Sequence, residues 1–95
     1  MLVNRRTFNV KAGHTQVVAN MIKSESARLK RQARIYINEI GPFDTVSCEF
    51  EFATLAEYEK FWKEWTASPE GESFLAKWHQ EVERGGNNEI WELFE

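Results

Sequence analysis

The stretch from Thr45 to Phe52 constrains the fold more than any other part of the chain. Its residues alternate, so that Val, Cys and Phe side chains fall on one side while Thr, Ser and Glu side chains fall on the other. Successive side chains of a β-strand point to opposite faces of the sheet, so this period of two predicts a strand. The chain therefore contains a sheet with one buried face and one polar face.

The segments around this strand predict the remaining elements. Residues 2–10 mix apolar, β-branched and polar types in rough alternation, residues 35–37 form a short β-rich run, and residues 88–94 follow a Gly-Gly-Asn turn. All three read as strands. Apolar residues recur at helical spacing from Thr15 to Leu29, before a basic turn that reaches Arg34, and again from Leu55 to Val82. These two regions predict helices.

Two local signals place the start and an interruption of the second helical region. Thr54 and Glu57 have the spacing of a capping box, in which the threonine accepts from first-turn amides while the glutamate reaches back. Ser68-Pro69 predicts that the helix stops and begins again, because serine caps a helix and proline suits its first position.

The resulting order is βαββαβ, and we predict an α+β fold of the ferredoxin-like kind. Right-handed crossovers give a four-stranded antiparallel sheet with the helices on one face. The 95 residues suffice for one core, so residues 1–95 form a single domain. The other sheet face stays bare, and an apolar or mixed patch of roughly several hundred Å² marks a binding surface. We expect this face to meet a second copy of the chain, giving a dimeric α/β barrel.

Composition narrows the classes of function. Cys48 is the only cysteine, so no intrachain disulfide forms, and we expect a reducing, cytoplasmic location. No signal-peptide run and no stretch of about 20 apolar residues is present, which predicts no membrane insertion.

The charge of the chain is divided unevenly between its halves. Residues 1–48 carry a net charge of +5 and residues 49–95 carry a net charge of −8. We expect no nucleic-acid binding, because Glu49 and Glu51 on the polar sheet face would repel phosphate.

Three short motifs resemble a known family. Arg6-Thr7-Phe8 and the run 10–13 (Val-Lys-Ala-Gly) resemble the opening of NIPSNAP-like proteins in the dimeric α/β-barrel superfamily, with alanine where that family often has proline. The restart at Ser68-Pro69-Glu70, before Phe74-Leu75 and Trp78, resembles that superfamily's second helix. The resemblance implies two sheets packed face to face and a cleft for a small, often apolar ligand. The superfamily includes cofactor-free monooxygenases, haem-handling enzymes and lactone isomerases, so the fold does not choose an activity.

The polar sheet face supplies the candidate ligand-binding residues. Since the first strand lies beside the third in this topology, we expect Arg5 within ion-pair distance of Glu49 or Glu51. Such a charged row could bind a ligand or act as acid and base, but we favour ion pairs that fix the register of strands and subunits. The candidates are Arg5, Thr7, Tyr36, Glu49, Glu51 and Trp91.

The second helical region carries the weak catalytic candidates. His79 and Trp65 could act as proton shuttle and ligand-stacking residue, but a lone histidine is more often a half-exposed surface residue. For Trp62 and Trp78 the helical spacing favours the core. Glu25 falls on the apolar stripe of the first helix. Either its carboxyl group is buried, or the apolar stripe is interrupted at this position.

Two functional hypotheses follow. The first is a ligand-binding or structural homodimer; the alternative is a small barrel enzyme, such as a cofactor-free monooxygenase of the antibiotic-biosynthesis type or a haem-handling oxygenase. Haem-degrading members use an asparagine, a tryptophan and a histidine, which correspond here to Asn4 or Asn9, Trp65 and His79. Trp65 and His79 lie on either side of the predicted helix break, and the glutamates of the polar face would repel haem propionates. We expect no haem, no other cofactor and no metal.

Overall fold

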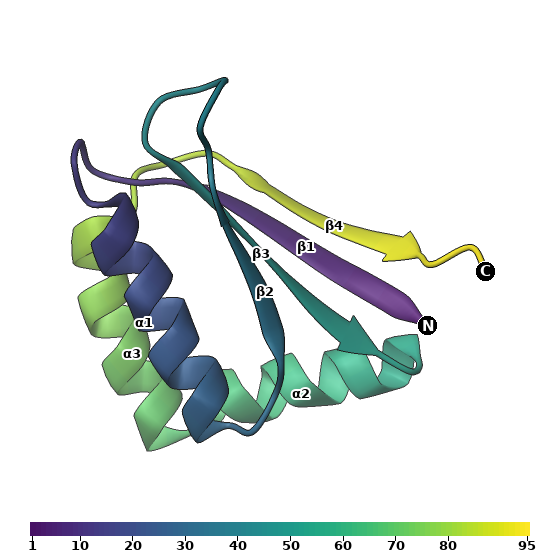
Figure 1. The fold of residues 1–95 in the computed structure, drawn as a ribbon. Helices are drawn as coiled ribbons and strands as arrows, with labels where there is room; N and C mark the ends of the chain where they lie inside the picture. The colour runs from purple at the N-terminus through teal and green to yellow at the C-terminus, as the bar shows by residue number, and fades with distance from the viewer.

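The computed structural model describes residues 1–95 and has the predicted order of elements, with the last helical region divided in two (Figure 1). The elements are β1 (Leu2–Asn9), α1 (Thr15–Arg28), β2 (Ala33–Ile37), β3 (Thr45–Phe52), α2 (Leu55–Ala67), α3 (Pro69–Glu81) and β4 (Asn87–Glu92). The boundaries of β3 agree with the sequence pattern. Arg34 lies in β2 rather than in the turn after the first helix, because α1 already ends at Arg28.

The four strands form one antiparallel sheet in the order β2-β3-β1-β4. Arg6 pairs with Cys48 and Arg5 with Glu49, so the parity of the residue number decides which face a side chain of β1 or β3 occupies. Even-numbered residues of these two central strands face the helices. Odd-numbered residues form the opposite side, called here the open face.

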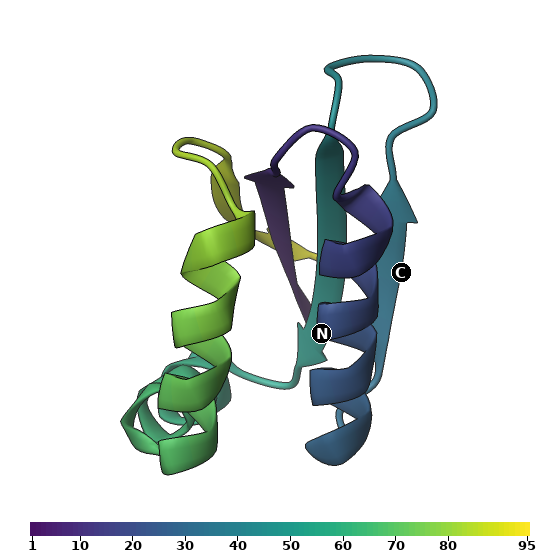
Figure 2. The same cartoon turned by 90° about the vertical axis from the view of Figure 1, so that its left-hand side faces the viewer.

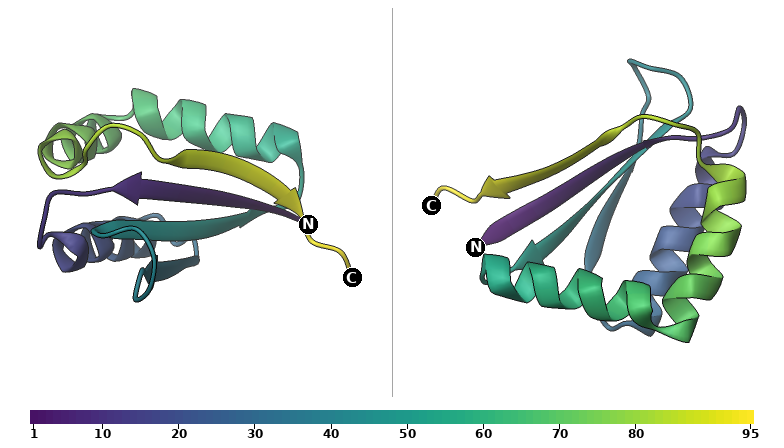
Figure 3. Two further views of the ribbon diagram at one scale, coloured as in Figure 1. Left: turned by 90° about the horizontal axis from the view of Figure 1, so that it is seen from above. Right: turned by 180° about the vertical axis from the view of Figure 1, so that it is seen from behind.

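All three helices lie on one side of the sheet (Figures 1 and 2). α1 and α3 run next to each other against that side, whereas α2 runs across the direction of α3 beneath the ends of the strands (Figure 3). The predicted ferredoxin-like fold is confirmed, and no helix covers the open face. None of the helices combines the length and apolar character that a bilayer crossing requires.

The core lies between the helix-facing side of the sheet and the helices. It is dominated by the even-numbered side chains of β3, joined by the residue that follows β1 and by residues of α1 and α3: Val10, Val18, Ile22, Val46, Cys48, Phe50, Phe52 and Trp78. Val17, also on the predicted apolar stripe, is instead 46% exposed, because one face of α1 packs on the sheet and Val18 and Ile22 occupy it.

Ser68 creates the change of direction between α2 and α3. Its extended backbone ends α2, and its hydroxyl donates to the carbonyl of Trp65 at 2.7 Å and accepts from the amide of Gly71 at 3.0 Å. One residue therefore caps the end of one helix and the start of the next. At the other end of α2, Thr54 accepts from the amide of Glu57 and the Glu57 carboxylate accepts from the amide of Ala53, so the predicted capping signal is confirmed.

Candidate functional site

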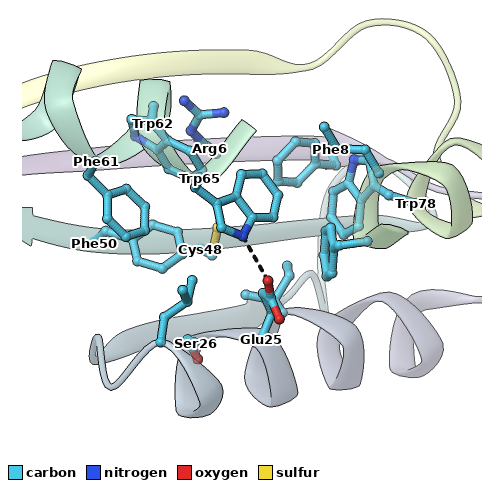
Figure 4. A pocket seen from close by; sticks show the side chains of 14 residues that line it. Arg6, Phe8, Glu25, Ser26, Cys48, Phe50, Phe61, Trp62, Trp65 and Trp78 are labelled. Carbon is cyan, nitrogen blue, oxygen red and sulfur yellow. Dashed lines mark hydrogen bonds between the residues drawn. The ribbon is translucent and has the colours of Figure 1, made fainter. Parts of the chain in front are cut away.

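An apolar pocket of about 90 Å³ lies between the helix-facing side of the sheet and the three helices. β1 and β3 form its floor, α1 one wall, and α2 and α3 the other (Figure 4). The volume exceeds the roughly 10–15 Å³ that one water molecule needs. Its walls are mostly apolar, with three polar or charged exceptions, which are Arg6 from β1 and Glu25 and Ser26 from α1.

A continuous series of aromatic rings forms the wall made by α2 and α3. The ring of Trp65 lies 5.7 Å from that of Trp62 and 5.4 Å from that of Phe74, and Phe74 stacks on Trp78 at 5.4 Å. Phe8 closes the series with an edge-to-face contact to Trp78 at 4.7 Å. Aromatic walls of this kind bind flat apolar groups by stacking and by excluding water.

Glu25 reaches the pocket from α1, and its carboxylate is hydrogen-bonded to other side chains of the protein. Its carboxylate accepts two hydrogen bonds of 2.8 Å from Arg28 and one of 2.7 Å from the indole nitrogen of Trp65, and its side chain is 15% exposed. The pKa of Glu25 lies below its ordinary value, and the hydrogen bonds from Arg28 are the main cause. Burial opposes this shift, and the hydrogen bond from Trp65 adds to it. Glu25 is therefore half-buried, and its carboxylate is engaged by Arg28 and Trp65 rather than left free where the stripe ends.

Arg6 enters the pocket from the opposite side, and its charge is not neutralised by the chain. The guanidinium lies 3.8 Å from the centre of the Trp62 ring, and its Nε donates to the Asn4 side chain at 3.0 Å. A long contact of 3.4 Å joins it to the Tyr58 hydroxyl. No carboxylate forms an ion pair with Arg6, although four other arginines of the chain have one.

The thiol of Cys48 forms part of the pocket floor but is unreactive at neutral pH. Burial is the main reason that its pKa rises to about 12, and the nearby Arg6 opposes that rise only in part. The thiolate is the nucleophilic form of cysteine, so Cys48 contributes a small apolar surface here. No three His, Cys, Asp or Glu side chains are grouped so that they could hold a metal ion.

The structure separates the two weak catalytic candidates. Trp65 lines the pocket, whereas His79 is exposed on α3 and is not part of the lining. Trp78 is a core residue, as the spacing favoured, and it also lines the pocket together with the half-buried Trp62. The expected repulsion of haem by Glu49 and Glu51 does not apply to this pocket, because both face the other way. The exposed position of His79 and the small volume remain as arguments against haem.

The six residues predicted to bind a ligand all lie on the open face. Arg5 is 3.9 Å from Glu49, which confirms the predicted ion pair. Glu49 also accepts from the Tyr36 hydroxyl at 2.9 Å, and this bond is the main cause of the raised pKa of Tyr36. Thr7 bonds Ser47 across the strands at 2.8 Å. The predicted charged row thus exists, and none of its residues lines the apolar pocket.

Open-face residues instead line polar depressions. Arg5, Thr7 and Tyr36 border one of them, and Glu49 and Glu51 border a second one at the β2 edge. Trp91 pairs with Val3 in the register, which places it on the same face, and it is 59% exposed.

Arg6 is the pocket residue that sequence reasoning missed. The strict alternation of the neighbouring strand was the available signal, because Arg6 is opposite Cys48 and must share its face. An arginine at a helix-facing position of a central strand is unusual, since charged residues are rarely buried without a partner.

Comparison with known proteins points to the fold. No protein-family model and no curated protein matches the chain. Among solved structures, an uncharacterised NIPSNAP-domain protein from Burkholderia xenovorans superposes with a TM-score of 0.84 at 15% identity, over 99% of this chain and 95% of that one. A NIPSNAP-family protein of unknown function from Agrobacterium tumefaciens gives 0.81 at 23% identity, over 96% and 86%.

A protein of a different class shares the fold more distantly. An antibiotic biosynthesis monooxygenase superposes with a TM-score of 0.73 at 9% identity over 100% of both chains. The resemblance to NIPSNAP-like proteins is therefore confirmed at the level of the fold. At these identities the likeness shows the architecture alone.

Proposed function

We propose that this protein binds a small apolar or aromatic molecule in the pocket between the sheet and its helices. The observation that carries the proposal is the aromatic wall of Trp62, Trp65, Phe74 and Trp78, which faces an unfilled volume of about 90 Å³. Protein interiors are normally packed to the density of organic crystals, so an apolar void of this size loses contacts that a ligand would restore. A concave apolar site with a few polar groups is the usual form of a ligand site.

The ionisable groups of the pocket favour binding over acid–base catalysis. A general acid or base works best with a pKa near the operating pH. The pKa of Glu25 is lowered and that of Cys48 is raised to about 12, so neither changes protonation near pH 7. Arginine stays charged. A cofactor-free monooxygenase remains the alternative function, supported by the shared fold of the antibiotic biosynthesis monooxygenase.

Titration with benzyl alcohol, followed by the indole N–H signals in ¹H–¹⁵N NMR spectra, tests the proposal. The signals of Trp65 and Trp78 should shift with saturable behaviour, whereas that of Trp91 on the open face should stay in place. Unchanged Trp65 and Trp78 signals at millimolar probe would contradict the proposal, and so would equal shifts of all four indoles.

A variant that fills the pocket gives the second half of the test. Cys48→Leu adds volume at the pocket floor and should abolish the probe-induced shifts. Val46→Ile adds a methyl group to the same face of β3 outside the pocket lining, and it should bind as the wild type does. Retention of binding by Cys48→Leu would place the probe elsewhere.

We further propose that the open face pairs with the open face of a second copy. This face carries cations (Arg5, Arg34) and anions (Glu49, Glu51, Glu89), which allows two identical faces related by a two-fold axis to complement each other. Its aromatic side chains are well exposed, Tyr36 at 44% and Trp91 at 59%. Such residues are enriched at protein interfaces. Light scattering should give about twice the chain mass of 11.2 kDa.

A further inference from the structure

The pocket contains one positive charge that the chain itself does not balance. Each carboxylate oxygen of Glu25, the acidic group of the pocket, accepts from Arg28, and one of them also accepts from Trp65. Arg6, on the other side of the pocket, has no carboxylate partner. The surplus charge of the pocket wall is therefore the guanidinium of Arg6.

The chain holds the Arg6 side chain in place without satisfying all of its donors. Stacking on Trp62 and the bond from Nε to Asn4 orient the plane of the guanidinium, and Nη2 makes only the long contact to Tyr58. Asn4 is in turn fixed, because its amide nitrogen donates to Asn88 at 2.7 Å and to the carbonyl of Glu89 at 2.9 Å. Arginine has five N–H donors, so several remain for a ligand.

A second donor beside Arg6 also lacks a partner. The indole nitrogen of Trp62 is buried and makes no hydrogen bond. Buried polar atoms without partners are uncommon in folded proteins and mark places where something is missing or where strain is stored. This part of the pocket wall therefore contains a cation without a carboxylate partner and, in the indole on which it stacks, a buried N–H donor without a partner.

We infer that the ligand is an aromatic monoanion, such as a small aryl carboxylate or an enolate, whose charged group pairs with Arg6 while its ring contacts Trp65 and Phe74. This inference rests on the proposed ligand-binding function and specifies the class of ligand. A planar guanidinium in partly buried surroundings matches the two oxygens of a carboxylate, and such charge-assisted bonds are the stronger ones. An uncharged ligand would leave Arg6 desolvated without an anion.

Benzoate and benzamide are nearly equal in size and differ in charge, so they separate the two proposals. With the indole N–H signals as the readout, the wild type should bind benzoate at least about tenfold more tightly than benzamide, the ratio that one charge-assisted hydrogen bond supplies. Equal affinities would overturn the inference and leave the pocket proposal intact. Failure of both compounds to shift Trp65 and Trp78 would contradict the proposed function as well.

Three variants test whether Arg6 is the recognising group. Arg6→Gln should bind the two compounds equally, and Arg6→Lys should keep a reduced preference for benzoate, because it retains the charge but not the planar fork. Arg84→Gln removes an exposed arginine outside the pocket and should preserve the wild-type preference. A full preference for benzoate in Arg6→Gln would show that another cation binds the anion. If Arg6→Gln does not fold, Arg6→Lys and the wild-type comparison still decide the matter.

Discussion

At the residue scale, the contact between Glu25 and Trp65 connects α1 to α2 across the pocket. The indole nitrogen donates at 2.7 Å to a carboxylate that Arg28 already holds in the ionised form. A hydrogen bond to a charged group contributes about 1.5–3 kcal/mol. Glu25 thus stabilises the contact between α1 and α2, and it also shapes the pocket, because it fixes the plane of the Trp65 ring.

Replacement of Glu25 by glutamine should lower the free energy of unfolding by about 1–2 kcal/mol at pH 7, because the bonds from Arg28 and Trp65 lose their charged acceptor. The pKa of Glu25 is lower in the folded chain than in the unfolded one. Its stabilisation is therefore present in full above the unfolded pKa of about 4.3 and is lost as the pH falls through the folded pKa.

Urea unfolding of wild type and Glu25→Gln at pH 7 and at pH 3 measures this effect. The difference between the two proteins should shrink at the lower pH. Glu64→Gln, a change at an exposed glutamate of α2, is the matched control and should leave stability unchanged at both values. A difference of equal size at both pH values would show that the charge of Glu25 does not contribute.

At the scale of the elements, the junction of α2 and α3 decides the shape of the aromatic wall. Gly71 is buried there, and a Cβ atom on it would lie 1.9 Å from the carbonyl oxygen of Trp65. The close approach of the two helix ends therefore requires the absence of a side chain. It also sets the position of Trp65, whose carbonyl accepts from the Ser68 hydroxyl and whose ring lines the pocket.

Gly71→Ala should destabilise the protein by about 2 kcal/mol, because the added methyl group forces two backbone segments apart. Intrinsic helix propensity alone predicts the opposite sign, since alanine is favoured over glycine by about 1 kcal/mol within a helix. Thermal unfolding checks the sign, and Ser73→Ala at an exposed position of the same helix is the control. An increase in melting temperature for Gly71→Ala would contradict the close contact.

At the scale of the whole molecule, the two faces of the sheet serve different purposes. The helix-facing side holds the core and the pocket, and the open face holds ion pairs such as Arg34 with Glu51 at 3.1 Å. Exposed ion pairs contribute little to the stability of a monomer, with a median of about 0–1 kcal/mol. Their concentration on a face that no helix covers fits a role in aligning two copies.

Introducing positive charges on this face should separate the copies. The double variant Tyr36→Lys, Trp91→Lys removes the exposed aromatic anchors and should shift the mass in light scattering from about twice to about once 11.2 kDa. Val17→Lys, at an exposed apolar position of α1 away from the sheet, should leave the dimer intact. A wild type that is monomeric at micromolar concentration would contradict the dimer, and loss of the dimer in Val17→Lys would place the interface on the helices.

The element order and the two-faced sheet were readable from the sequence, because they follow from local rules. Alternation gave β3 its limits and its buried side, and Ser68-Pro69 marked the helix break. The adjacency of the first and third strands predicted an ion pair of Arg5 with Glu49 or Glu51, and the structure has the pair with Glu49. These features depend on neighbours in the chain or on the register of adjacent strands. The alternation of apolar and polar residues along a strand therefore shows which side chains face the core without knowledge of the rest of the fold.

Only the tertiary structure decided the pocket. Glu25 and Trp65 are 40 positions apart, and they meet because the Ser68 break and the close packing at Gly71 direct α2 across the sheet. The direction that a helix takes after a break depends on packing against distant residues, which no local pattern encodes. For the same reason no local pattern shows that Arg6 lacks a carboxylate partner, because this depends on where the fold places every acidic side chain.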